Sequence, residues 1–154
     1  MKISMASDHT GFELKSFLSW KLKALGHKVI DLGTDSGRKP SDYPDYAKKT
    51  ALGILAEKAE RGILICGSGV GACIAANKFP GIRAGVCHDT YSAKQAVEHD
   101  DLNVLCLGAR VVGTHLAWEI TETFVNAEFS KEERHVKRLK KIKSFETKNW
   151  GIGV

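Results

Sequence analysis

The sequence contains no long apolar run and few residues that mark secreted or fibrous proteins. Its hydrophobic stretches fall well short of the roughly 20 residues that a membrane-spanning helix requires, and no pattern typical of a secretory signal opens it. Only 3 of the 154 residues are proline, and no low-complexity tract is present. We therefore expect a cytoplasmic protein, without a membrane partner, whose length fits one ordinary domain.

The 4 cysteines lack the spacing that binds zinc or builds a disulfide framework. They are Cys66, Cys73, Cys87 and Cys106, with no Cys-x-x-Cys pair and no matching pair of histidines. Cys87 and Cys106 lie inside apolar, strand-like runs, where cysteine behaves as a small buried hydrophobe. The sequence therefore predicts reduced thiols and no metal site.

The charge balance favours an anionic ligand, because the formal net charge is +5. Much of this charge comes from the basic stretch 137–143, and such a run is usually a solvated helix face. Nucleic-acid-binding proteins interleave basic residues with exposed aromatics or carry a recognisable reading module, and neither is apparent in this sequence. We therefore expect a small anion as the partner, and no nucleic acid.

Short apolar runs alternate with segments of helical length along the whole chain. The runs are rich in β-branched residues, and they occur at 2–6, 28–32, 62–66, 83–87 and 104–108. Helices are predicted between the first two runs, with Gly26 at the end, and at about 45–59, 70–78, 90–98 and 114–127. Such alternation is typical of parallel strands joined by crossover helices.

A last helix is predicted near the carboxyl terminus, where Ser130 and Glu133 match a capping box. Its apolar side would hold Val136, Leu139, Ile142 and Phe145. The predicted fold class is thus α/β: a single doubly wound, Rossmann-like three-layer sandwich with a five-stranded parallel sheet and a C-terminal helix. We expect one domain over 1–150 and a flexible tail at 151–154.

The carboxyl ends of the predicted strands direct the search for a site, since ligands of such sheets bind there. Three segments leaving strand ends carry unusual chemistry, namely 7–11, 67–71 and 108–110. The second follows Cys66 and reads Gly67-Ser68-Gly69-Val70-Gly71. Its backbone N–H groups, with a helix dipole behind them, would form an anion hole for a phosphate or an enediolate.

Cys66 adjoins this glycine loop, and a thiol next to a helix N-terminus loses its proton more readily than free cysteine. We therefore interpret Cys66 as a base or nucleophile rather than a core residue. The loop also satisfies a loose dinucleotide fingerprint, with Gly67, Gly69 and Ala72 followed by Asp89. That match falls on the third strand instead of the first, and a nucleotide P-loop is excluded because no Gly-Lys-Ser/Thr follows.

Two further groups of polar residues have a functional and a structural interpretation each. Asp8 and His9 could bind phosphate or move protons, or Asp8 could simply cap the helix that follows. Arg134 and Arg138 share a helix face at i, i+4, where they could clamp a phosphate or belong to a solvated basic face. His99, at a helix end, has the same two readings.

Together these segments resemble the sugar-phosphate isomerase family that includes ribose-5-phosphate isomerase B and galactose-6-phosphate isomerase subunits. The resemblance extends over essentially the whole chain. The matching motifs are Ser7-Asp8-His9-Thr10-Gly11-Phe12, Asp31-Leu32-Gly33-Thr34, Asp42-Tyr43-Pro44-Asp45-Tyr46, the block 62–71, Gly81-Ile82-Arg83-Ala84 and Arg134-His135-x-x-Arg138.

The resemblance implies interconversion of ribose 5-phosphate and ribulose 5-phosphate without metal or cofactor, in active sites shared across a homodimer, with a tetramer as a further option. Its implied catalytic residues are Cys66 as the base at C2, Ser68 as a proton relay, His99 in ring opening and Asp8 near it. The implied substrate-binding residues are His9, Tyr43, Gly67, Gly69, Val70, Gly71, Asp100, Arg110, Arg134 and Arg138.

One position departs from the family pattern, which normally reads His-Asn-Asp where this chain has His99-Asp100-Asp101. A carboxylate there bears on which sugar is preferred more than on the reaction type. The alternatives are therefore the same chemistry on a tetrose, allose or galactose phosphate, or a non-catalytic binder of sugar phosphates or nucleotides.

Overall fold

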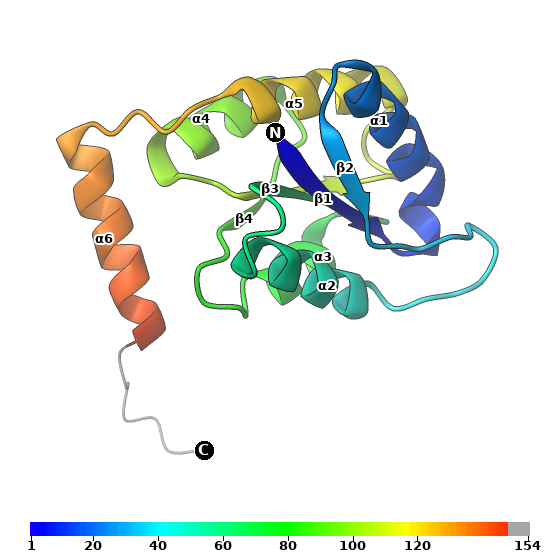
Figure 1. Ribbon diagram of the computed structural model, residues 1–154, viewed down its shortest axis with the longest axis horizontal. Coiled ribbons are helices and arrows are strands. Elements are labelled where there is room, and N and C mark those ends of the chain that lie inside the picture. The colour runs from blue at the N-terminus through cyan, green and yellow to red at the C-terminus, as the bar shows by residue number, and fades with distance from the viewer. Residues whose placement is uncertain (148–154) are drawn as a thin grey trace.

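Strands and helices alternate along residues 1–147, the part of the chain that the computed structural model describes (Figure 1). The strands are β1 (Lys2–Ser7), β2 (Lys28–Asp31), β3 (Arg61–Cys66), β4 (Ala84–Val86) and β5 (Val104–Gly108). The helices are α1 (Phe12–Ala24), α2 (Tyr43–Leu55), α3 (Val70–Ala76), α4 (Thr90–Asp100), α5 (Thr114–Asn126) and α6 (Glu133–Thr147), with a 3-10 turn η1 (His9–Gly11) before α1. The tail predicted at 151–154 lies outside the described residues.

The strands form one parallel sheet in the order β2-β1-β3-β5-β4. β1 and β3 are neighbours although β2 lies between them in sequence, so the strand order reverses at this pair. Ser7 lies opposite Ile65, and Cys66 lies opposite Gly108, so three strands end side by side. The predicted doubly wound α/β sandwich is confirmed, and the switch point is where β1 and β3 end.

Two layers of helices bury the two faces of the sheet, with α1, α4 and α5 on one face and α2 and α3 on the other (Figure 1). Successive side chains of β3 point to opposite faces. Ile63 and Ile65 therefore pack in the cluster that contains Phe124, whereas Leu64 and Cys66 pack in the cluster under α2 and α3. The thiol of Cys66 is thus held on the α2/α3 side.

Helix α2 begins and ends earlier than the predicted range 45–59. Its first turn contains Pro44, whose constrained φ suits the start of a helix. At the other end, Glu57 takes a positive φ of 55°, which cannot continue a right-handed helix. The helix therefore stops at Leu55, and residues 56–59 form the turn into β3.

The predicted capping box at Ser130 and Glu133 is wrong. The N–H of Ser130 donates to the carbonyl of Glu98 instead of to the Glu133 side chain, and the Ser130 hydroxyl accepts from Glu132 N–H. Lys131 has a positive φ of 58°, which turns the chain before α6 begins. The N–H of Ser130, which the Glu133 side chain would bond in a capping box, is therefore bonded to α4 instead.

Helix α6 stands apart from the sandwich and lies next to the end of α4 (Figure 1). Of its predicted apolar side, Leu139 is buried, whereas Ile142 is 39% and Phe145 55% exposed. None of the helices in residues 1–147 is long and apolar enough to cross a membrane. Within residues 1–147, the predicted apolar side of α6 is therefore buried at Leu139 and more exposed toward its carboxyl end.

Candidate active site

The glycine loop between β3 and α3 holds the Cys66 thiol at the switch point of the sheet. Cys66 is almost fully buried, and its Sγ accepts a hydrogen bond from Gly69 N–H at 3.1 Å. Gly69 has a φ of +82°, and a Cβ there would lie 3.0 Å from the carbonyl carbon of Leu107. Only glycine fits this position without strain, so the loop geometry that donates to the thiol depends on it.

A second amide of the loop is engaged by Ser68. The N–H of Val70 donates to Ser68 Oγ at 3.3 Å. Within the described part of the chain, this leaves the amides of Gly67, Ser68 and Gly71 as the loop donors that could face a ligand. Two amides of the predicted anion hole, those of Gly69 and Val70, thus donate to the side chains of Cys66 and Ser68.

Asp8 follows β1 and lies at the same edge. Its Oδ1 accepts from Thr10 N–H at 2.9 Å, Thr10 Oγ1–H at 2.5 Å and Gly11 N–H at 3.2 Å. The backbone N–H of Asp8 donates to the carbonyl of Ile65, which precedes Cys66. The capping interpretation of Asp8 is confirmed, because it caps η1, and its buried carboxylate also lines the cavity that Cys66 lines.

His9 is oriented by the long loop that follows β2. Its Nδ1 lies 3.1 Å from the backbone nitrogen of Ser41 and 3.3 Å from the carbonyl oxygen of the same residue. The backbone N–H of His9 in turn donates to Ser41 Oγ at 3.1 Å. The loop therefore fixes the orientation of the His9 ring through contacts with its Nδ1 and its backbone.

A cavity of about 360 Å³ opens above these residues, a volume in the range of small-molecule sites. Tyr43 forms one wall and packs so closely that a Cβ on Gly71 would lie 2.6 Å from its ring. Arg110 overhangs the loop, with Nη1 3.7 Å from where a Cβ of Gly67 would be. The cavity is lined by Asp8, Thr10, Tyr43, Cys66, Gly67, Ser68, Gly71, Arg110 and Val111.

Thr10, Val111 and Ser41 contribute to this site but were not among the predicted site residues. Thr10 belongs to the segment 7–11 that the sequence did single out, and its hydroxyl is the shortest contact of Asp8. Val111 directly follows Arg110 and lines the cavity with 56% of its surface exposed. Ser41 carries no signal in the sequence, because its contact with His9 spans 32 residues.

The remaining predicted residues, His99, Asp100, Arg134 and Arg138, lie at the opposite edge of the sheet. Helix α4 runs back from the carboxyl edge, so its last turn, with His99, precedes β5 at the amino edge. Helix α6 begins beside it, and the rings of His99 and His135 stack with centroids 4.0 Å apart. Within one chain, these residues do not join Cys66.

In this second cluster the imidazole of His135 is buried, whereas Arg134 and Arg138 are exposed. Burial lowers the pKa of His135, and the nearby His99 and Arg134 act in the same direction. Ser130 Oγ lies 2.7 Å from Nδ1 of His135. Arg134 is exposed and pairs with Glu132 at 2.7 Å, and this hydrogen bond lowers the pKa of Glu132.

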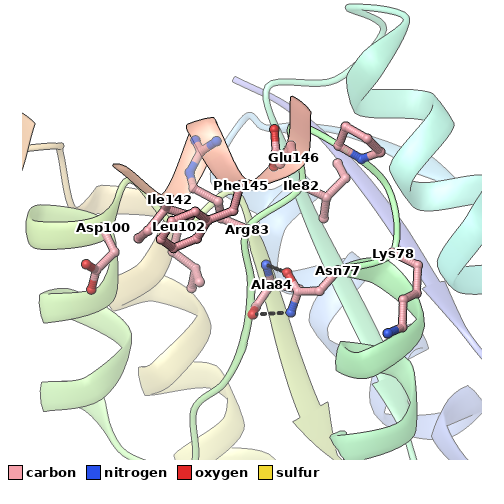
Figure 2. A pocket seen from close by; sticks show the side chains of 11 residues that line it. Asn77, Lys78, Ile82, Arg83, Ala84, Asp100, Leu102, Ile142, Phe145 and Glu146 are labelled. Carbon is pink, nitrogen blue, oxygen red and sulfur yellow. Dashed lines mark hydrogen bonds between the residues drawn. The ribbon is translucent and has the colours of Figure 1, made fainter. Parts of the chain in front are cut away.

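A larger cavity of about 580 Å³ lies at the amino edge, between the end of α4, the segment before β4 and α6 (Figure 2). Phe145 and Ile142 of α6 form part of its wall beside Leu102, and Asp100 lies at one side. Gly81 N–H donates to Glu146 Oε1 at 2.9 Å, which ties the end of α6 to this edge. The cavity holds no glycine loop and no thiol among its lining residues.

The alternative dinucleotide site is disfavoured by Asp89. This carboxylate caps α4 and accepts from Ser92 N–H at 2.7 Å, which lowers its pKa. It is therefore engaged at a helix start instead of being free to bind a ribose. The geometry of the loop is that of a small anion site beside a thiol.

The other three cysteines do not line the carboxyl-edge cavity. Cys87 and Cys106 are buried, as predicted, and burial raises the pKa of Cys87 to about 11. The hydrogen bond with the Cys106 thiol lowers the pKa of Cys73 to about 7, while Cys73 Sγ also donates to the carbonyl of Ala84. All four cysteines are free thiols.

Comparison with known proteins gives one consistent result. The model of the Ribose/Galactose Isomerase family matches residues 3–142. The chain is 46% identical over 145 residues to ribose-5-phosphate isomerase B of Escherichia coli, covering 94% of this chain and 96% of that one. It is 43% identical over 129 residues to D-erythrulose-4-phosphate isomerase of Pectobacterium atrosepticum, covering 84% and 85%.

A solved structure shows the same fold. Ribose-5-phosphate isomerase B of Clostridium thermocellum superposes with a TM-score of 0.93 at 47% identity, covering 96% of this chain and 98% of that one. The likeness therefore extends over almost the whole length of both chains.

Proposed function

The chain belongs to the ribose/galactose isomerase family, and we propose that it interconverts ribose 5-phosphate and ribulose 5-phosphate in active sites that two copies build together. The observation that carries this proposal is the buried Cys66 thiol, which accepts a hydrogen bond from Gly69 N–H at the floor of a cavity of about 360 Å³. A base held next to free backbone donors is the arrangement that proton abstraction beside a carbonyl requires.

The proposed reaction moves one proton between carbons and one between oxygens. His99 helps to open the furanose ring, and Cys66 then removes the proton from C2 of the open aldose. The loop amides stabilise the resulting enediolate. Cys66 returns its proton to C1, while Ser68 relays the hydroxyl proton from O2 to O1, which yields the ketose with all atoms accounted for.

The phosphate would be bound at the far end of the sugar from Cys66. His9 supports this role because Ser41 holds its ring in a fixed orientation, and Arg110 adds a guanidinium above the loop. Arg134 and Arg138 would complete the clamp, and Tyr43 would shape the wall beside the sugar. No metal is assigned a step, and we expect EDTA treatment to leave the rate unchanged in the coupled assay.

The division of the predicted residues between two edges supports a shared site. β3 has 6 residues, and a strand rises about 3.3 Å per residue, so the two edges are about 17 Å apart. A sugar phosphate spans less than that distance. In a two-fold dimer, the amino edge of one copy can meet the carboxyl edge of the other, and symmetry then creates two equal sites.

Exposed apolar side chains near both edges support the same arrangement. Val70 and Ile74, one turn apart on α3, are 50% and 57% exposed beside the glycine loop. Ile142 and Phe145 are exposed on α6 at the other edge. Large exposed apolar side chains such as Val70 and Ile74 are common at interfaces between subunits.

A mixing experiment tests the shared site. We expect Cys66→Ala and His99→Ala homodimers to be nearly inactive on ribose 5-phosphate. A purified heterodimer of the two, made by co-expression with different tags, should recover about half the wild-type rate, because one of its sites has both lesions and the other has none. A heterodimer as inactive as the two parents would contradict a shared site.

Asp100 favours a second candidate substrate within the same chemistry. It is exposed at the end of α4, where a carboxylate could accept a hydrogen bond from a sugar hydroxyl, and one relative acts on D-erythrulose 4-phosphate by name. An assay of wild type and Asp100→Asn on ribose, tetrose, allose and galactose phosphates separates the cases. Improved ribose 5-phosphate turnover with loss on another sugar would assign the chain to that other sugar.

A further inference from the structure

We propose that Arg83 is a positioning residue for His99. The inference rests on the proposed function, because it takes His99 as the group that helps to open the sugar ring. Arg83 does not line the carboxyl-edge cavity but lies in the wall of the amino-edge cavity, as Asp100 does. It would act on the reaction through the end of α4, which carries His99 to the site of the second copy.

The side chain of Arg83 makes two hydrogen bonds to Asp101, and we call this pair of contacts the grip on Asp101. Its Nε–H donates to the backbone carbonyl of Asp101 at 2.7 Å, and its Nη2–H donates to Asp101 Oδ2 at 2.6 Å. Nη1–H also donates to the carbonyl of Gly81 at 3.3 Å. The side chain of Arg83 is 15% exposed, so water screens this pairing less than it would a surface pair.

The gripped residue ends α4. Asp101 has a positive φ of 53°, a left-handed conformation that residues other than glycine rarely adopt and that Asp tolerates better than most. A guanidinium at this place stabilises that conformation, because it hydrogen-bonds the turn and lies at the negative end of the helix dipole. His99 and Asp100 are the two residues immediately before this turn, so the grip on Asp101 sets where the last turn of α4 ends.

The backbone of Arg83 is itself anchored to the sheet. Its N–H donates to Asn103 Oδ1 at 2.8 Å, and its carbonyl accepts from Asn103 N–H at 3.1 Å. Asn103 Nδ2–H also donates to the carbonyl of Gly81 at 2.9 Å. Since Arg83 directly precedes β4 and Asn103 directly precedes β5, the grip connects the end of α4 to the rigid edge of the sheet.

His99 is then held from two sides. Its backbone belongs to the turn that Arg83 fixes, and its ring stacks on the buried ring of His135 at 4.0 Å. Proton transfer needs heavy atoms within hydrogen-bond reach, and a displacement of about 1 Å can cost about 100-fold in rate. A lysine keeps the charge of Arg83 but lacks the planar fork, so it cannot make both contacts with Asp101 in the same geometry.

A double-mutant cycle on the full-length dimer tests the inference. We expect Arg83→Lys to lower kcat/KM for ribose 5-phosphate by about 10- to 100-fold. In the His99→Ala background, the same substitution should change the remaining rate less than about twofold, because a residue that acts through His99 has nothing left to position. Asp101→Asn, which weakens the same grip, should give the same pattern, and it serves if Arg83→Lys fails to fold.

Lys94→Met is the matched control. Lys94 lies on the same helix, and its exposed pair with Glu98 at 3.7 Å does not touch the turn, so we expect wild-type kcat/KM. Equal fractional losses from Arg83→Lys in the wild-type and His99→Ala backgrounds, or a wild-type rate for Arg83→Lys, would overturn the inference in an active enzyme. A wild-type protein that isomerises no aldose phosphate would instead contradict the proposed function.

Discussion

The two edges of the sheet carry different kinds of chemical group. At the carboxyl edge, the cavity is formed by backbone amides, short side chains and the buried Cys66 and Asp8. At the amino edge, the candidate groups are long or charged and mostly exposed, as for Arg134 with 61% of its side chain in solvent. The carboxyl-edge groups are therefore mostly enclosed by the chain itself, whereas several amino-edge groups face solvent.

Each edge also lacks what the other has. The cavity at the carboxyl edge is lined by the thiol proposed as the base, by residues of the glycine loop and by one arginine, Arg110. The amino edge offers His99 and two arginines without a glycine loop. Two half-sites of complementary chemistry on one chain are what a two-fold assembly can combine, because each copy then both gives and receives a half. Substitutions at the two edges should therefore differ in size and kind.

The largest effect is expected at the buried edge. Cys66→Ala removes the proposed base, and general acid–base groups contribute about 10²- to 10⁴-fold, so turnover should fall by that factor while binding of inorganic phosphate stays close to wild type. The measurements are kcat in the coupled assay and phosphate affinity by calorimetry. Cys87→Ala, at another buried thiol, should retain turnover, and a Cys66→Ala enzyme with near-normal kcat would rule out the thiol as the base.

At the exposed edge, the expected effect falls on binding. Arg134→Ala or Arg138→Ala should each weaken substrate binding by about 1.5–3 kcal/mol, the range for a charged hydrogen bond. The effect should be seen chiefly as a higher KM. Lys137→Ala, on the same helix, is the control and should leave KM unchanged. If both arginine variants bind substrate and inorganic phosphate like the parent, the arginines belong to a solvated face. The proposal that the amino edge binds the phosphate would then be wrong.

A methyl group can test how rigid the buried edge is. Gly71→Ala places a Cβ 2.6 Å from the ring of Tyr43, so the wall or the loop must shift, at about 1–3 kcal/mol. We expect a lower melting temperature and lower kcat/KM. Gly113→Ala is the matched control, since no atom lies within 4 Å of its Cβ position. If the two glycine variants had equal activity, the ring of Tyr43 would be free to move away from the added methyl group.

The smallest effect concerns His135, the buried group of the amino edge. Burial lowers its pKa, so protonation favours the unfolded chain, where histidine titrates near about 6.5. The free energy of unfolding should therefore decrease as the pH falls below about 6.5, and His135→Gln should reduce that slope. Urea unfolding between pH 5 and 7.5 measures it. His115→Gln, at an exposed histidine, should keep the wild-type slope.

Much of the carboxyl edge was predictable because its contacts are short in sequence. Cys66 and Gly69 are 3 residues apart, and Asp8 and Thr10 are 2 apart. The capping role of Asp8 and the buried state of Cys87 and Cys106 followed in the same way from local patterns. Where a local pattern failed, as in the capping box at Ser130, a contact from outside the segment had taken the hydrogen bond, here the carbonyl of Glu98.

By itself, the sequence determined the α/β class, the five parallel strands and the position of the thiol beside the glycine loop, because periodicity and loop chemistry act over a few residues. Only the tertiary structure decided that His99 and the α6 arginines lie at the opposite edge from Cys66, and that Arg83 grips Asp101 across 18 residues of chain. Such contacts depend on how crossover helices pack against the sheet, and that packing is settled by the whole core at once.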